Sequence, residues 1–138
     1  MFSITHNPEL VLPILEEDVG VRGFMGQLFG LTKDSKVVVA AGFESYNGSN
    51  VVVSLVIRTK FIPRLFWWAL GDYCFNVLGC VRVTAVIDES NEKSIQITEH
   101  IGFVKEATLK QAGTGGQDSI VYVLWKENYK WLGVREHG

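Results

Sequence analysis

The stretch VRVTAVIDESNEKSIQITEHIGF, residues 81–103, contains two kinds of regular pattern in one continuous run. In its first part, VRVTAVI, apolar and polar residues alternate in the way that is typical of a half-buried strand. From Asn91 to Gly102 no other glycine and no proline interrupts the chain, which favours a helix that begins at the asparagine, a good N-cap residue. Acidic residues on both sides of Asn91 suit the positive end of a helix dipole. The stretch therefore predicts a strand followed by a helix.

One face of this predicted helix carries a hydroxyl group where an apolar side chain is expected. The face consists of positions i, i+3, i+4 and i+7, which are Ser94, Ile97, Thr98 and Ile101. It has to lie against the sheet or against a cleft beside the sheet. Ser94 either donates back to a carbonyl group of its own helix or takes part in chemistry. The residue pattern alone leaves both interpretations open.

A predicted β-hairpin precedes this region. Residues 35–46 and 50–59 are rich in β-branched side chains, and the NGS sequence between them contains Asn47-Gly48, a strong turn signal. Both runs are almost continuously apolar, as is typical of strands covered on both faces. We therefore expect helices above and below the sheet.

The remaining segments complete an alternating order of elements. Residues 63–79 predict a helix whose circumference is almost entirely apolar, so that it is buried from several directions. A helix lying on a membrane surface is the alternative, but it would carry more Lys or Arg on a polar face. Residues 103–110 and 119–127 predict a final strand pair, and residues 7–27 predict one or two short helices. This order predicts an α/β fold with a mixed sheet.

Composition limits the class of protein. The 138 residues, 47% of them hydrophobic, suit a single domain spanning 1–138. A net charge of -2 and a pI of about 5.9 give no general attraction to nucleic acid or to an anionic membrane. No signal-peptide pattern or spanning segment is seen, so we expect a cytoplasmic protein. Cys74 and Cys80 lack metal-site spacing and are expected to be reduced packing residues, and the scattered histidines predict no metal site.

An ordered set of short motifs follows the strand at 81–87. Its members are Asn91, Ser94, Gly102-Phe103, Lys105-Glu106 and Val121-Tyr122. The set resembles the C-terminal half of the GNAT superfamily of acetyl-CoA-dependent N-acetyltransferases, most closely the branch that acetylates ribosomal-protein and other amino-terminal groups. In element order the resemblance covers residues 36–126. It implies a GNAT-like mixed, mostly antiparallel sheet with two splayed central parallel strands and helices on both faces.

The resemblance also implies a cofactor and a mechanism. The pantetheine arm of acetyl-CoA would pair with the backbone of Leu55, Val56 and Ile57 as an additional strand. An amine would then attack the acetyl carbonyl directly, with no acyl-enzyme. Many members use a tyrosine to protonate the leaving thiolate, but that position is Thr98 here. In the amino-terminal branch a serine matching Ser94 is thought to serve instead, and Asn91 would contact the pantetheine arm.

The chain departs from the family pattern in the loop after the first splayed strand. The family binds the CoA pyrophosphate on a glycine-rich loop, whereas residues 58–66 read RTKFIPRLF. Arg58, Lys60 and Arg64 supply positive charge there and would bind the phosphates through charge-assisted hydrogen bonds. The alternative is a solvated basic rim with a weak or absent cofactor site.

The general base and the acceptor are the least determined features. Glu44, near the end of a hairpin strand, is the candidate base; a merely solvated glutamate, with an ordered water as the base, is the alternative. We expect an amine acceptor, either a protein amino terminus or a small molecule, and a monomer or homodimer. Two rival functions remain: a GNAT-fold binding protein without catalysis, and an interaction protein that uses aromatics such as Trp131.

Overall fold

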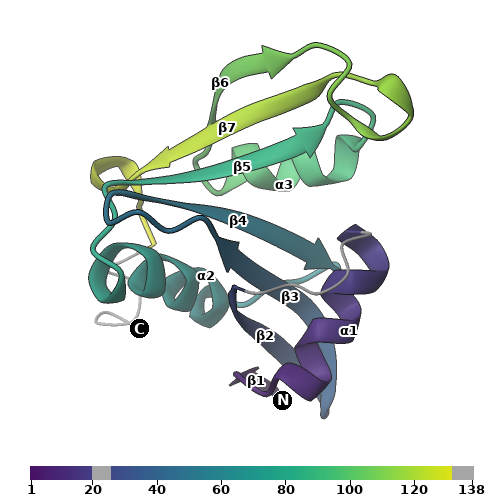
Figure 1. The fold of residues 1–138 in the computed structure, drawn as a ribbon. Coiled ribbons are helices and arrows are strands. Elements are labelled where there is room, and N and C mark those ends of the chain that lie inside the picture. Colours follow the sequence, from purple (N-terminus) through teal and green to yellow (C-terminus); the bar gives the residue numbers. More distant parts are fainter. Residues whose placement is uncertain (20–25, 132–138) are drawn as a thin grey trace.

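The computed structural model describes residues 1–19 and 26–131 (Figure 1). Its elements in chain order are β1 (Phe2–Thr5), α1 (Pro8–Val19), β2 (Gln27–Lys33), β3 (Lys36–Glu44), β4 (Asn50–Ile57), α2 (Arg64–Gly71), β5 (Arg82–Asp88), α3 (Glu92–His100), β6 (Val104–Leu109) and β7 (Ser119–Trp125). The seven strands form one sheet in the order β1-β2-β3-β4-β5-β7-β6. Only β4 and β5 pair in parallel, and the other neighbouring strands pair antiparallel.

The predicted fold class is confirmed, and so is the order of elements from residue 36 onward. The β3–β4 hairpin turns where Asn47-Gly48 predicts it. The Asn47 side-chain oxygen accepts from the backbone N–H groups of Ser49 and Asn50 at 3.0 and 2.9 Å, and Gly48 has a φ of 95°. Strands β1 and β2 were not predicted from the sequence.

Helices cover both faces of the sheet, as expected. Successive residues of a strand point to opposite faces, so Val39 and Ala40 of β3 belong to different hydrophobic clusters. On one face, Val11 and Leu15 of α1 pack against Ala40 and Val56. On the other face, the larger core includes side chains of α2, the chain just after α3, and β3, β4, β5 and β7.

Helix α1 begins at the Asn7 cap, whose side-chain oxygen accepts from the N–H of Glu9 at 3.0 Å. The segment that predicted one or two short helices is thus a single helix up to residue 19, with Pro13 inside it. Gly30 of β2 lies beneath it: a Cβ atom there would come within 3.0 Å of a Val11 methyl group and 2.9 Å of the Val39 oxygen. The missing side chain lets the helix approach the sheet closely.

The helical run that begins with α2 ends where the sequence predicts, since Gly79, with a φ of 71°, follows it, but only its first part is α-helical. Pro63 is an extended N-cap residue rather than part of the first turn, and after Gly71 the chain continues as a π-helix over Asp72–Val77. Gly71 packs directly against the ring of Tyr129, whose hydroxyl group donates to the Trp67 carbonyl oxygen. The buried surroundings expected for this helix are confirmed by Trp67, which is 5% exposed.

Candidate active site

The two parallel strands are paired at only one end. Their register runs from Asn50 opposite Arg82 to Val52 opposite Thr84. Beyond this point β4 continues to Ile57 and β5 to Asp88 without pairing to each other, and Figure 1 shows the two strands diverging. We call the paired part the joined end and the separated part the open end. The splayed pair that the family resemblance implies is therefore present.

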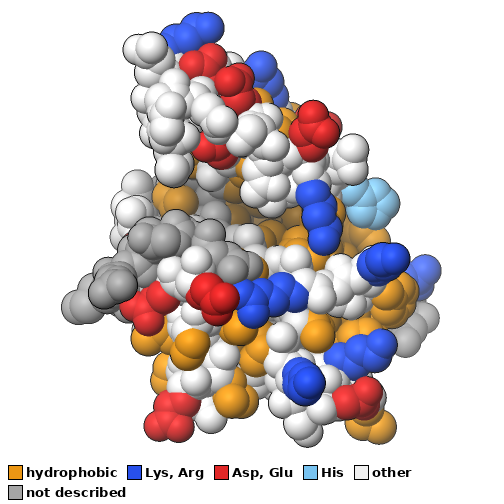
Figure 2. Space-filling model, turned by 90° about the vertical axis from the view of Figure 1, so that its right-hand side faces the viewer, with side chains coloured by type: hydrophobic (Ala, Val, Ile, Leu, Met, Phe, Trp, Pro, Cys, Tyr) orange, Lys and Arg blue, Asp and Glu red, His pale blue; other side chains and the backbone are white. Residues whose placement is uncertain are grey.

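A cleft of about 500 Å³ occupies the space between the separated strands. Its walls are residues 53–57 of β4, residues 85–88 of β5, one side of α3, Phe103, residues 112–114 and Ser119. Figure 2, turned by 90° from Figure 1, shows a hollow whose interior carries hydrophobic side chains and whose margin carries Lys or Arg. The cleft is thus lined by apolar side chains of both strands together with many polar side chains and backbone groups.

The register identifies which backbone groups of β4 face the cleft. The N–H of Arg58 donates to the Val38 oxygen at 2.8 Å, so the even-numbered residues of β4 bond to β3. The N–H and C=O groups of Leu55 and Ile57 therefore point into the cleft. Those of Val56 point toward β3, and its side chain packs under α1. The backbone groups of Val56 are thus engaged with β3 and do not face the cleft.

The same reasoning applies to β5 on the opposite wall. Hydrogen bonds from the N–H of Lys126 to the Val81 oxygen and from the N–H of Glu89 to the Asp118 oxygen show that its odd-numbered residues bond to β7. The backbone of Val86 therefore faces the cleft. We did not predict this residue from the sequence, because the direction of the groups follows from register and not from side-chain type.

The start of α3 brings Asn91 and Ser94 to the cleft together. The Asn91 side-chain oxygen accepts from the Ser94 N–H at 3.3 Å, which is the N-cap bond that the sequence predicts. Ser94 is half-buried and lines the cleft. Within the described part of the chain its hydroxyl group makes no hydrogen bond, so the alternative of bonding back to its own helix is not observed. One turn further on, Thr98 is 6% exposed and also lines the cleft.

The rim beside α3 is built around Asp88. Its carboxylate accepts from the Ser90 N–H at 3.1 Å and from the Ser90 hydroxyl at 2.8 Å. Gly113 lies so close that a Cβ atom there would come within 2.8 Å of this carboxylate. The glycine-rich connection between β6 and β7 is thus packed onto the cleft, a role we did not predict for it. Lys93 lines the cleft on the same side.

The residues of the basic loop are not among the described residues that line the cleft. The chain leaves β4 toward β1, where the ring centroids of Phe61 and Phe2 are 5.8 Å apart. Arg58 forms an ion pair with Glu17 at 3.6 Å. Neither Lys60 nor Arg64 is among the described residues that line the cleft. The structure therefore does not bring these three cations together at the cleft.

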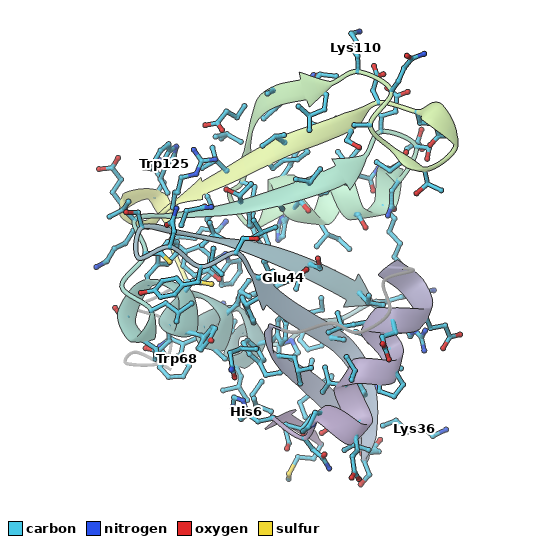
Figure 3. The ribbon with its side chains drawn as sticks, viewed as in Figure 1. His6, Lys36, Glu44, Trp68, Lys110 and Trp125 are labelled. Atoms are coloured by element: carbon cyan, nitrogen blue, oxygen red, sulfur yellow. The ribbon has the colours of Figure 1, made fainter. Side chains whose placement is uncertain are left out.

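Glu44 lies near the joined end. It is exposed, is the last residue of β3 and stands opposite Val52, which belongs to the last paired rung between β4 and β5. Figure 3 shows it beside β4. Glu44 is not among the described residues that line the cleft. Its side chain lies on the same face of the sheet as that of Ser54, which does line the cleft.

Burial changes the acidity of one side chain next to the cleft. Tyr122 stands opposite Ala85, a cleft residue, and is 2% exposed. Burial raises the pKa of its hydroxyl group, and the hydrogen bond that this group donates to Glu99 at 3.1 Å raises that pKa further. Tyr122 therefore stays protonated at neutral pH. Among residues 1–19 and 26–131 no cluster of His, Cys, Asp and Glu that could hold a metal ion is found.

Comparison with known proteins identifies the fold. No family model and no curated protein matches the sequence. Among solved structures, a chimera of spermidine N-acetyltransferase SpeG from Vibrio cholerae and hSSAT is similar with a TM-score of 0.71 at 17% identity, over 96% of this chain and 98% of that one. The fold is that of the GNAT acetyltransferases.

Two further structures agree. A GNAT-family acetyltransferase from Bacillus anthracis has a TM-score of 0.61 at 20% identity, over 72% of this chain and 66% of that one. Mutant forms of the spermidine/spermine N-acetyltransferase SpeG from Vibrio cholerae have a TM-score of 0.66 at 18% identity, over 86% of this chain and 76% of that one. These GNAT structures do not single out the amino-terminal branch. No described helix of this GNAT-fold chain is long and apolar enough to cross a membrane.

Proposed function

We propose that this protein is an N-acetyltransferase that moves the acetyl group of acetyl-CoA to an amine. The observation that carries the proposal is the cleft at the open end, where β4 and β5 present backbone hydrogen-bonding groups that have no partner strand. A pantetheine arm contains two amide groups, so it pairs well with such an edge. The fold shared with GNAT acetyltransferases supports the same activity.

The reaction is a direct transfer. The neutral amine nitrogen attacks the thioester carbonyl carbon, the carbon–sulfur bond breaks, and the amine proton passes to a base while the departing thiolate takes up a proton. Acetyl-CoA supplies the activated acyl group, and the chain has to orient it, accept the amine proton and stabilise the carbonyl oxygen. The N–H groups of Leu55 and Ile57 are the donors that β4 offers to the cofactor.

Ser94 and Asn91 act on the cofactor from the opposite wall. The Ser94 hydroxyl is half-buried, lines the cleft and has no partner in the described chain, so it is free to donate to the thioester sulfur or the thiolate. Asn91 holds the first turn of α3 in place and contacts the pantetheine arm. Glu44, exposed at the joined end, is the proposed base, directly or through a water. Arg58, Lys60 and Arg64 remain the proposed phosphate contacts, with Arg58 leaving Glu17 to reach them.

The acceptor is an amine, and two classes should be compared. Two of the similar solved structures are described as spermidine or spermidine/spermine N-acetyltransferases, which supports a small polyamine. The motif resemblance supports a protein amino terminus. A polyamine is a flexible polycation, whereas a peptide amino terminus is one charge on a chain, so the two classes can be separated by direct competition.

A binding protein without catalysis is the second candidate. It is favoured by the path of residues 58–63, which leads away from the cleft and leaves Arg58 paired with Glu17. Without phosphate contacts, acetyl-CoA would be held by its pantetheine arm alone. Such a protein would recognise a different extended ligand at the same backbone edge.

Thermal unfolding with and without acetyl-CoA tests the proposal first. Ligand at one hundred times its Kd adds about 2.7 kcal/mol to the free energy of unfolding, which corresponds to a rise in Tm of roughly 10 °C. Spermidine and a short peptide with a free amino terminus should then be offered with acetyl-CoA, and acetylated product measured by mass spectrometry. No change in Tm at millimolar acetyl-CoA would reject the proposal, whereas a change without any product would favour the binding protein.

A further inference from the structure

A network of polar side chains crosses from β4 to β5 at the joined end. Its centre is Thr84, which is 9% exposed. The Thr84 hydroxyl donates to the side-chain oxygen of Asn50 on β4 at 2.7 Å. The Thr84 hydroxyl oxygen in turn accepts from Nε and Nη2 of Arg82 at 3.3 and 3.1 Å. Both hydrogen-bonding capacities of a buried hydroxyl are therefore used, and one of them joins the two parallel strands.

The network extends to the outermost strand of the sheet. Arg82 donates through Nη1 and Nη2 to the two carboxylate oxygens of Glu106, at 3.1 and 2.8 Å. Glu106 is the extra residue of a bulge in β6, since the register passes from Lys105 to Ala107. A bulge redirects a side chain, and this one directs Glu106 across β7. The Arg82 guanidinium also lies 5.4 Å from the ring of Trp125, which Figure 3 shows at the joined end.

The position of the network coincides with the point where pairing stops. The last rung between the parallel strands joins Val52 and Thr84, so the residue at the centre of the network is also the last paired residue of β5. Beyond it, the backbone edges of both strands are open to the cleft. A three-rung parallel pair has little cooperativity of its own, and the side chains supply a second connection at its terminal rung.

We propose that Thr84, Asn50, Arg82 and Glu106 are positioning residues that fix where the cleft begins. The effect on the cofactor rests on the proposed function. If the terminal rung opened in a fraction of the molecules, the unpaired edge of β4 would lengthen and the inner wall of the cleft would move. The apparent Kd of acetyl-CoA would rise in proportion, because only molecules with the closed rung would bind.

Replacing one hydroxyl group tests the proposal. Thr84→Val keeps the shape of the side chain and removes its hydrogen bonds, while Thr84→Ser restores the hydroxyl and is the matched control. Amide hydrogen exchange is measured by NMR in the ligand-free protein. In Thr84→Val we expect amide exchange at residues 51, 53 and 84, whose N–H groups face the partner strand of the β4–β5 pair, to accelerate about fivefold or more, with the β2–β3 ladder unchanged. The Kd of acetyl-CoA should rise about fivefold, and Thr84→Ser should restore both values.

A second variant guards against a folding defect. Glu106 is partly exposed, so Glu106→Gln removes the charge without disturbing the core, and we expect smaller changes in the same two quantities. Equal acceleration of exchange in the β4–β5 pair and in the β2–β3 ladder, or no acceleration at residues 51, 53 and 84, would overturn the proposal. If the unaltered protein bound no acetyl-CoA, the proposed function would fail, while the contrast between the two ladders would still decide the role of the network.

Discussion

Leu55→Pro is the substitution that most directly tests the unpaired edge of β4. The N–H of Leu55 faces the cleft and is not used by the β3–β4 ladder, so a proline there removes a donor that the fold does not need. The N–H of Val56, by contrast, belongs to the ladder, since Val56 stands opposite Ala40. Val56→Pro is therefore the matched control, and it should destabilise the whole domain.

The magnitude follows from the bond that is lost. If a cofactor carbonyl accepts from the Leu55 N–H, its removal leaves a buried acceptor unsatisfied, which costs about 1–3 kcal/mol. The Kd of acetyl-CoA should then rise roughly 5- to 150-fold. Leu55 is half-buried, so loss of its side chain also has an effect, and Leu55→Ala measures that part separately.

Isothermal titration with acetyl-CoA at fixed ionic strength gives the Kd of the unaltered protein, of Leu55→Pro and of Leu55→Ala. Urea unfolding gives the stability of these proteins and of Val56→Pro. We expect Leu55→Pro to bind at least fivefold more weakly than Leu55→Ala while unfolding at a similar urea concentration. Equal affinity of these two variants would refute the reasoning, because the cofactor would then not be paired with this edge.

Three other outcomes are expected. Ser94→Ala should lower kcat at least tenfold and leave the Kd of acetyl-CoA within twofold; normal values of both would make the serine an ordinary helix hydroxyl. Gly71→Ala should lower the free energy of unfolding in urea by about 1–3 kcal/mol, since its methyl group would meet the Tyr129 ring, and an unchanged midpoint would contradict that packing. Burial raises the pKa of the Cys74 thiol well above its usual range, so the folded state keeps a proton that the unfolded state loses above about pH 8.5. Stability should therefore fall as pH rises from 8 to 9.5, by at most about 1.4 kcal/mol per unit for this group, and an equal fall in Cys74→Ala would exclude Cys74 as a cause.

Local patterns predicted the elements that carry strong periodic signals. The Asn47-Gly48 turn and the cap at Asn91 are short-range features, and the structure confirms both. Cys74 and Cys80 are free and buried, as their spacing indicates. Strands β1 and β2 were missed because they lack this kind of signal: β1 is short, and β2 carries Gly30 at its centre.

The candidate site was predictable in its residue types and less so in its geometry. Ser94 and Asn91 are at the cleft because one helix turn brings them there. The roles of Val56 and Val86 depend on strand register, which no single segment encodes. The path of the basic loop could not be predicted from its own residues, since Phe61 packs on Phe2, a partner almost sixty residues away in the chain.

The short contact between β4 and β5 also has a mechanical consequence. Strands β1–β4 and strands β5–β7 are each joined by antiparallel ladders, while the sheet hydrogen bonds between the two groups run through three parallel rungs beside the hydrophobic core that both groups share. Under a pulling force or on heating, the domain should part first along that line, and each half would keep its own ladder for a time. An elongated molecule lying in the gap would bridge both halves and carry part of the load.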